Sequence, residues 1–508
     1  MQATVLSSAV LGVDALIVEV EVDISSGLPA MAVVGLPDGA VKESRDRVRA
    51  ALKNSGYECP ARRITVNLAP ADIKKEGSAF DLAIGLAILA ATGLLRTERI
   101  HEYAILGELS LDGRVKPVRG ALPIAASAAR SGLRGLLVPA SNAGEAAVVD
   151  DIEIIPIDTI AEAFEFLRGE RSIAPASTDL QQVFAEHARY DVDFSEVKGQ
   201  EHVKRALEVA AAGGHNVIMV GPPGSGKTML AKRLPTILPP LTLDEAIETT
   251  RVHSVMGLMH GRALIAARPF RAPHHTISDA GLIGGGSIPR PGEVSLAHHG
   301  VLFLDELPEF RKNVIEVLRQ PLEEMRITIS RAVGSITYPA NVMLVAAMNP
   351  CPCGFYGDPQ KECTCATLHV QRYRARVSGP LLDRIDIQVE VPAVAYRELA
   401  DRSVSESSAD IRARVERARR IQLERFCGRD IYCNAQMTAR DLRNHCRVDT
   451  GAERLLESAM TKLGLSARAY TRILKVARTI ADLGGETEIG VTHIAEAIQY
   501  RSLDRSFH

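Results

Sequence analysis

The amino-acid sequence predicts an α/β protein with an N-terminal α/β or α+β domain, a second α/β domain and a C-terminal helical domain. Residues 1–168 alternate short apolar strands with helical patterns, and a second segment of this kind opens with a strand, a glycine-rich loop and a helix. Beyond that segment the apolar pattern is almost wholly helical. We therefore expect domains at 1–168, 195–392 and 393–508, with a linker at 169–194.

Length and composition favour a soluble protein with several hydrophobic cores. The chain has 508 residues, 46% of them hydrophobic, which is enough for roughly two to four domains. No charged N-terminal segment precedes an apolar one, and no apolar run reaches the roughly 18 residues of a membrane span. We expect a cytoplasmic protein with no membrane partner. The net charge of −2 does not indicate nucleic-acid binding, so a DNA surface would have to come from locally placed arginines.

The N-terminal domain is predicted from short local patterns. The runs ALIVEVEVDI, ITVNLAP and GLLVP are typical of strands, whereas DLAIGLAILAATGLL and ALPIAASAARSG are typical of helices. The Asp112-Gly113 pair predicts a tight turn between two short strands. Residues 169–194 lack a periodic apolar pattern and are therefore interpreted as a linker.

The second α/β domain opens with a phosphate-binding motif. The strand NVIMV runs into GPPGSGKT and then into a helical pattern. In this setting the loop and the helix N-terminus face a polyphosphate, Lys227 reaches the β- and γ-phosphates, and the Thr228 hydroxyl can bind Mg²⁺. The strand before the motif and the helix after it favour an ATP site over a chance Gly-Lys turn. The predicted nucleotide-binding residues are Gly221, Pro222, Pro223, Gly224, Ser225, Gly226, Lys227 and Thr228.

Two later strands are expected to bring polar groups to the same site. Val301–Leu304 predicts a buried parallel strand that ends in Asp305 and Glu306. We expect Asp305 to hold Mg²⁺ and Glu306 to orient the attacking water, instead of merely capping a helix. The strand NVMLVAAMN ends at Asn349, which is placed to sense the γ-phosphate.

A group of four cysteines follows Asn349 in the pattern C-x-C-x₉-C-x-C. Its members are Cys351, Cys353, Cys363 and Cys365. Four thiols at this loop separation fit a tetrahedral zinc ion, and His369 could replace one ligand. The alternative is four reduced thiols on a surface loop, which would be open to oxidation and without a packing role. We predict zinc, which would hold a long loop in one shape.

The order of these motifs resembles one protein family over the whole chain. The P-loop is followed by FLDE, a strand ending in asparagine, the segment SGPLLDRIDI and a helical region containing SARAYTRILKVARTIADL. With the blocks RPFRAPHHTISDAGLIGGGSIPRPGEVSLAHHGVLFLDELPEF and MNPCPCG, the chain resembles the ComM (YifB) family of magnesium-chelatase-like AAA+ ATPases. The resemblance implies an AAA+ P-loop core with a parallel sheet and a helical lid. It also implies a ring-forming, usually hexameric ATPase that moves on DNA and drives branch migration in homologous recombination, notably in natural transformation.

Two arginines gain roles from this resemblance. Arg384 in LLDRID resembles the arginine finger offered to a neighbouring subunit's nucleotide, where a guanidinium neutralises charge on the transferred phosphoryl group. The alternative for Arg384 is a surface pair with Asp383 or Asp386. Arg468 matches the sensor arginine of the lid, with Arg472 one helical turn further on as the alternative.

Two insertions are candidates for contact with single- and double-stranded DNA. The segment DAGLIGGGSIPRPGEVSLAHHG is rich in glycine and proline without a core periodicity, so we expect it to protrude. The segment EMRITISRAVGSITYPANV predicts two short strands joined around Gly334. Hairpins of this kind line the central pore in related ring ATPases, which makes Arg290 and Arg331 candidate phosphate contacts. Solvation alone would also account for an arginine on either loop.

The N-terminal domain carries a second resemblance. The segments KKEGSAFDLAIGLAIL and GELSLDGRVKPVRGALPIAASAARSGLRGLLVP resemble the proteolytic domain of Lon-type proteases, which use a Ser-Lys dyad. The aligned positions fall near Ala79 and Leu122, with Ser78 one place out of register. We therefore expect a Lon-like fold without proteolysis. The competing functions are an ATP-dependent protease and an ATPase subunit that helps to insert Mg²⁺ into a porphyrin.

Overall fold

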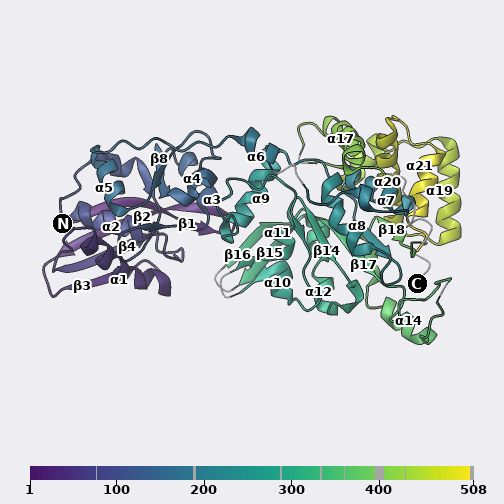
Figure 1. Cartoon of the computed structure of the whole chain (residues 1–508), viewed down its shortest axis with the longest axis horizontal. Helices are drawn as coiled ribbons and strands as arrows, with labels where there is room; N and C mark the ends of the chain where they lie inside the picture. The colour runs from purple at the N-terminus through teal and green to yellow at the C-terminus, as the bar shows by residue number, and fades with distance from the viewer. Residues whose placement is uncertain are drawn as a thin grey trace. The chain divides into compact units, whose positions relative to one another are not determined.

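A computed structural model gives the fold of the chain (Figure 1). It describes residues 1–75, 77–186, 190–286, 289–331, 334–359, 361–394, 405–429 and 431–503. The chain divides into two compact units. The first consists of Met1–His187 and Thr242–Ala266, and the second of Ala188–Leu241 and Ala267–His508.

The first unit is built on a mixed seven-stranded sheet in the order β3-β4-β2-β1-β5-β8-β9. These strands are β1 (Gln2–Leu11), β2 (Asp14–Ser25), β3 (Ala30–Val34), β4 (Arg63–Ala69), β5 (Tyr103–Ile105), β8 (Gly135–Pro139) and β9 (Glu153–Ile157). Neighbours β1, β2 and β4 are antiparallel, and the remaining pairs are parallel. The predicted turn at Asp112-Gly113 joins β6 (Glu108–Leu109) to β7 (Val115–Lys116).

Helices pack against both faces of this sheet. Ile105 and Leu137 belong to one core cluster, whereas their neighbours Ala104 and Leu136 belong to another, because adjacent strand residues point to opposite faces. The first cluster includes α1 (Gly39–Asn54), α2 (Asp81–Ala91) and α5 (Ile160–Arg168). The second includes α3 (Ala121–Arg130) and α4 (Ala140–Ala146). The strands and helices expected from the sequence of this domain are present.

The segment Thr242–Ala266 differs from the predicted domain division. It was placed within 195–392, but its helix α9 (Leu243–Val255) packs against α3 in the first unit. The backbone carbonyl of Ser254 accepts a hydrogen bond from the N–H of Gly120 at 3.2 Å, and its hydroxyl contacts Glu145. These partners lie more than 100 residues away in the chain, so local periodicity could not indicate them.

The predicted linker at 169–194 is fixed at both ends. The N–H of Ala176 donates to Ile154 and the hydroxyl of Thr178 donates to Gly144, each at 2.8 Å. A short helix, α6 (Leu180–Glu186), follows, and Phe194 is fully buried in the core of the second unit. The segment therefore contains anchored residues of each unit.

A parallel five-stranded sheet forms the centre of the second unit, in the order β11-β14-β17-β10-β18 (Figure 1). The strands are β10 (Val217–Val220), β11 (Phe270–Arg271), β14 (Val301–Leu304), β17 (Met343–Met348) and β18 (Ile387–Glu390). The strand order reverses at β10, since β17 lies on one side of it and β18 on the other. Ligands of open parallel sheets bind at the carboxyl ends of strands beside such a reversal.

The second unit also contains helices between and after these strands. Helix α7 (Glu201–Gly213) precedes the first of these strands, and those between the strands are α8 (Lys227–Arg233), α10 (Asp279–Ile283), α11 (Glu293–Leu296), α12 (Lys312–Glu316), α13 (Arg319–Glu324), α14 (Thr367–Arg374) and α15 (Gly379–Leu382). The C-terminal ones are α17 (Ser408–Arg425), α18 (Ala439–His445), α19 (Thr450–Leu463), α20 (Ala467–Gly484) and α21 (Val491–Gln499). The predicted helical character of the C-terminal region is therefore observed. None of the helices in the described ranges is long and apolar enough to cross a membrane.

Candidate functional site

The glycine-rich loop lies between β10 and α8, at the strand where the sheet order reverses. All four residues of β10 are buried, and Gly224 and Gly226 adopt positive φ angles of 78° and 91° that favour glycine. Lys227 is buried at the start of α8. Its Nζ donates to the carbonyl oxygens of Gly221 at 2.7 Å and Pro222 at 2.8 Å. The lysine thus occupies the concave side of the loop, where a phosphate group would lie.

The ends of β14 and β17 meet this loop, as the sequence predicted. The Thr228 hydroxyl donates to Asp305 Oδ2 at 2.6 Å, and Lys227 Nζ lies 3.2 Å from Oδ1 of Asn349. Burial lowers the pKa of Lys227, whereas the charges of Asp305 and Glu306 act in the opposite direction. One hydroxyl, one carboxylate, one amide and one ammonium therefore converge from three elements. Oxygen donors of this kind suit Mg²⁺ bound to a phosphate.

Glu306 follows Asp305 in a left-handed backbone conformation, with φ 52°. Its side chain is largely exposed, and its Oε2 lies 3.7 Å from Nδ1 of His275. Because Glu306 is not held in a buried ion pair, its carboxylate can accept a hydrogen bond or a proton from water. The geometry is consistent with the predicted role of Glu306, which stays a prediction.

Two buried polar atoms at the loop support a nucleotide fit. The hydroxyl of Ser225 and Oε1 of Gln200 have no hydrogen-bond partner among the described residues. Gln200 also donates from Nε2 to the carbonyl oxygens of Ser225 at 2.8 Å and Pro392 at 3.0 Å. Buried polar atoms without a hydrogen bond destabilise a fold unless a ligand or a water molecule supplies that bond. Gln200 was not predicted as a site residue, although a glutamine directly before a helix at positive φ is an unusual local choice.

Arg384 is buried and pairs with Glu323, a residue 61 positions earlier on α13. The Arg384 side chain is only 5% exposed, and its Nε has no hydrogen-bond partner within the described ranges. The alternative of a surface pair with Asp383 or Asp386 is wrong, because those residues pair with other arginines. Acting on a neighbouring subunit would require Arg384 to leave Glu323, so the arginine finger stays a prediction.

The two candidate lid arginines on α20 differ in exposure and in their ion pairs. Arg472 pairs with Asp386, which is 2% exposed at the start of β18. Arg468 is 63% exposed and only approaches Asp383, at 3.5 Å. A guanidinium held in a buried ion pair is not available to a nucleotide, so the geometry favours Arg468 as the sensor and gives Arg472 a structural role.

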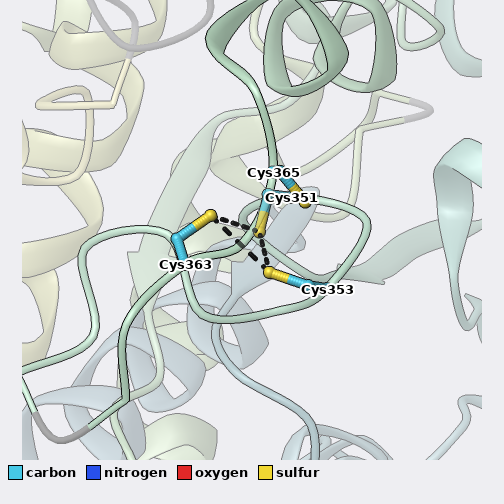
Figure 2. Close-up of side chains that lie close together, drawn as sticks. All are labelled: Cys351, Cys353, Cys363 and Cys365. Carbon is cyan, nitrogen blue, oxygen red and sulfur yellow. Dashed lines mark hydrogen bonds between the residues drawn. The ribbon is translucent and has the colours of Figure 1, made fainter.

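The four cysteines of the C-x-C pairs lie together after β17 (Figure 2). Their sulfur atoms all lie within 4.8 Å of one another. Cys351 Sγ is 3.3 Å from Cys353 and 3.7 Å from Cys363, and the last two are 3.6 Å apart. His369, the predicted substitute, does not belong to this group of ligand atoms among the described residues. The backbone N–H of Phe355 lowers the pKa of the Cys353 thiol to about 5.

The two predicted DNA insertions contact each other in the second unit. The first forms the strands β12 (Gly284–Gly285) and β13 (Arg290–Pro291), and the second forms β15 (Arg326–Arg331) and β16 (Gly334–Pro339). Residues 287–288 and 332–333, which follow β12 and β15 in sequence, lie outside the described residues. Arg331 Nε donates to the carbonyl of Gly286 at 3.4 Å, and the Tyr338 hydroxyl donates to Pro289 at 2.7 Å.

Arg290 and Arg331 are both exposed on these hairpins. The first insertion is less extended than predicted, because α10 and α11 form within it and bury Leu282 and Val294. The hairpins themselves are as expected, and the two arginines are accessible to phosphates. Contact with DNA stays a prediction.

The Lon-like positions in the first unit carry no Ser-Lys pair. Leu122 is a fully buried apolar residue of α3, and Ala79 precedes α2. The hydroxyl of Ser78 contacts Glu108, whereas the buried Lys75 donates from Nζ to the carbonyl of Pro70. A serine bound to a carboxylate is not activated by a lysine base, so these residues do not support proteolysis.

Comparison with known proteins places the chain in a family. Profiles of the magnesium chelatase subunit ChlI match residues 193–399 and 20–142, and its C-terminal profile matches 405–501. The competence protein ComM of Haemophilus influenzae is 46% identical over 508 residues, covering 99% of this chain and 98% of that protein. The protein YifB of Escherichia coli is 44% identical over 499 residues, 98% of this chain and 96% of YifB.

A shorter match is more distant. An archaeal Lon protease of Methanothermobacter thermautotrophicus is 28% identical over 129 residues, 24% of this chain and 20% of that protein. The full-length similarity is much higher than this local one. The chain therefore belongs to the ComM/YifB family of magnesium-chelatase-like AAA+ proteins, with a Lon-like N-terminal α/β domain, a P-loop core with a parallel sheet and a helical C-terminal region.

Proposed function

We propose that this protein is a ring-forming ATPase, usually hexameric, that couples ATP hydrolysis to movement on single- and double-stranded DNA. The proposed task is branch migration in homologous recombination, including natural transformation. The observation that carries the ATPase assignment is the convergence of Lys227, Thr228, Asp305 and Asn349 where the sheet order reverses. The name of the 46% identical relative, a competence protein, supports the biological setting.

Each residue of the site has a separate role in the proposed ATP hydrolysis. Bound Mg²⁺ would supply charge neutralisation on the phosphates, and Thr228 and Asp305 are the residues that would hold it. Lys227 contributes a buried positive charge, and Asn349 lies beside it to report on the terminal phosphate. Glu306 would orient water for in-line attack. Zn²⁺ at the four cysteines completes the proposed set of cofactors.

The DNA part of the proposal is supported by the paired hairpins. Both carry an exposed arginine, and the guanidinium of Arg331 on one hairpin contacts the backbone of the other. A surface built from two contacting loops can present several cations to one phosphate backbone. Such contacts do not read sequence, which suits a protein that moves along DNA.

A three-part assay tests this function. ATP hydrolysis is measured with and without DNA, and strand exchange is measured on a three-stranded branched substrate. We expect DNA to stimulate hydrolysis and ATP to drive the branch point. Lys227→Ala should abolish nucleotide binding, whereas Glu306→Gln should bind ATP but hydrolyse it at least about 100-fold more slowly. Wild-type turnover in both variants would contradict the site.

The same preparation separates the competing functions. ATP-dependent casein cleavage without DNA stimulation would favour a protease, in spite of Ala79 and Leu122. Complementation of porphyrin metallation would favour a chelatase subunit. If DNA does not change the rate of ATP hydrolysis and the branch point does not move, movement on DNA is refuted.

A further inference from the structure

The spacing of the four sulfur atoms distinguishes a metal site from other arrangements of cysteine. Zinc bound tetrahedrally to thiolates has Zn–S distances of about 2.3 Å, which places the sulfurs about 3.8 Å apart. The separations among Cys351, Cys353 and Cys363, at 3.3, 3.6 and 3.7 Å, are close to this value, and the Cys365 sulfur lies within 4.8 Å of the other three. A disulfide would require about 2.05 Å, and all eight cysteines of the chain are free. In Figure 2 the sulfurs of Cys351, Cys353 and Cys363 lie together, and Cys365 lies beside Cys351.

The described part of the loop that carries these thiols is not stabilised by helices or strands. Between β17 and α14 its described residues form turns and irregular backbone instead of helices or strands. Its aromatic residues lie with cations: Lys361 stacks on Phe355, and Arg374 stacks on the half-exposed Tyr356. Of the four thiols only Cys351 is buried. A segment without an apolar core of its own is typical of loops folded by a structural metal.

One residue of this loop touches the phosphate-binding loop. Gly354 directly follows Cys353 and has φ 87°. A Cβ atom at Gly354 would lie 2.5 Å from Cδ of Pro223, the third residue of the P-loop motif. The backbone of Gly354 lies so close to the Pro223 ring that a side chain here would clash with it, and the positive φ also favours glycine. On the other side of the cysteines, Cys351 is two residues from Asn349, which contacts Lys227.

The space next to this contact is a cavity of about 910 Å³. Its walls include Gly221 and Pro222 of the P-loop, and Gly354 and Tyr356 of the cysteine loop. Arg374 of α14 closes another side and donates from Nε to the carbonyl of Pro350 at 3.1 Å. The cysteine loop therefore forms part of the wall beside the phosphate-binding loop.

We infer that Cys351, Cys353, Cys363 and Cys365 hold one zinc ion in a closed structural site, and that the bound ion keeps Gly354 against Pro223. Metal occupancy then controls the shape of the phosphate-binding loop and with it the affinity for nucleotide. The link to nucleotide rests on the ATPase function proposed above, whereas the metal site itself does not. Four thiolates leave no open coordination position, which excludes a catalytic role for the ion.

The test begins with metal and thiol content of the full chain purified without chelators. We expect about one zinc per chain by atomic emission and, on exchange for Co²⁺, the visible absorption of tetrahedral thiolate ligation. Cys363→Ser should lose the metal, whereas Cys427→Ser, an exposed cysteine outside the group, should retain it. Absence of zinc, with either four freely reactive thiols or a disulfide among them, would overturn the site.

The second measurement is the affinity for a fluorescent ATP analogue, without DNA. Removal of zinc by a zinc-selective chelator, with Mg²⁺ kept in constant excess, should weaken binding by about tenfold, and re-addition of zinc should restore it. Gly354→Ala keeps every ligand, so it should retain zinc and still bind the analogue about tenfold more weakly, because alanine is strained at this φ. This variant tests the contact even if Cys363→Ser does not fold.

The outcomes separate the parts of the inference. Zinc present with unchanged affinity after chelation and in Gly354→Ala would refute the link to the P-loop. Failure of the analogue to bind wild-type protein that carries zinc would count against the ATPase proposal instead. Neither readout depends on movement along DNA, so failure of that function would leave both unchanged.

Discussion

Replacing Asp386 by asparagine is expected to destabilise the second unit much more than the same change at Asp383, the other aspartate of the LLDRID segment. The Asp386 carboxylate is 2% exposed and pairs with Arg472 of α20. It also accepts the N–H of Asn216 at 2.9 Å and lies 3.7 Å from Nδ1 of the fully buried His215. The side-chain amide of Asn216 in turn donates to the carbonyl of Arg384 at 3.0 Å.

The expected loss of stability in Asp386→Asn follows from the burial of this carboxylate. Although burial alone would raise the pKa of Asp386, Arg472, His215 and the Asn216 N–H hold that pKa well below its usual range. Asparagine removes the negative charge and leaves the guanidinium of Arg472, which is 21% exposed, without its counterion. Removing one partner of a buried pair costs about 3–5 kcal/mol. Asp383 is the matched control: it is 33% exposed beside an exposed Arg468, so Asp383→Asn should cost less than about 1 kcal/mol.

The pH dependence has a definite sign. Because the pKa of Asp386 is lower in the folded protein than in the unfolded chain, its contribution is present above the unfolded value of about 3.9. It is lost as the pH falls below that value. The stability difference between wild type and Asp386→Asn should therefore shrink as the solution becomes more acidic than about pH 4.

Hydrogen exchange during urea titration measures this stability for β18 and α20 separately from the first unit, which a single melting curve would not do. Arg472→Met and the double variant complete a double-mutant cycle and should give a coupling of about 2 kcal/mol or more. Equal costs for Asp386→Asn and Asp383→Asn, or no coupling to Arg472, would refute the reasoning.

Two further predictions concern assembly and DNA. Arg384→Ala should leave nucleotide affinity largely intact but lower turnover by about 10³-fold, and mixing it with Lys227→Ala subunits should restore part of the activity at hybrid interfaces. No recovery under conditions of subunit exchange would count against action on a neighbour. Replacing Arg290 and Arg331 together should weaken DNA binding equally for all sequences and reduce the slope of log affinity against log salt by about 2, as measured by fluorescence anisotropy. An unchanged slope would place the DNA surface elsewhere.

The elements predictable from the sequence are those whose cause is local. Val301–Leu304 is a strand with the predicted bounds, because four adjacent apolar residues are buried on both faces of a parallel sheet. The P-loop and the position of Asn349 follow similarly, since each polar residue comes directly after a buried strand. The contacts between Lys227 and Asn349 and between Thr228 and Asp305 then result from strand adjacency.

Features that depend on distant partners were not predictable. Arg384 stands next to one aspartate in sequence, but the fold places Glu323 closer to its guanidinium. The contact of Gly354 with Pro223 joins two loops that are 131 residues apart in the chain. No periodicity in either segment carries that information. The short helices α10 and α11 depend on burying Leu282 and Val294 in the second unit, which a glycine-rich pattern does not indicate.

Because Thr242–Ala266 belongs to the first unit, the two units are not connected by a single segment of the chain, which limits how gene fusion or loss could separate them. The chain passes between the units three times: after α6, after Leu241 and after Ala266. A gene fusion or loss at one point can add or remove a domain only if a single segment connects it. Here a break before Phe194 would separate α9 from α3, against which it packs. A single break or fusion point therefore cannot separate the first unit from the second while keeping the packing of α9 against α3.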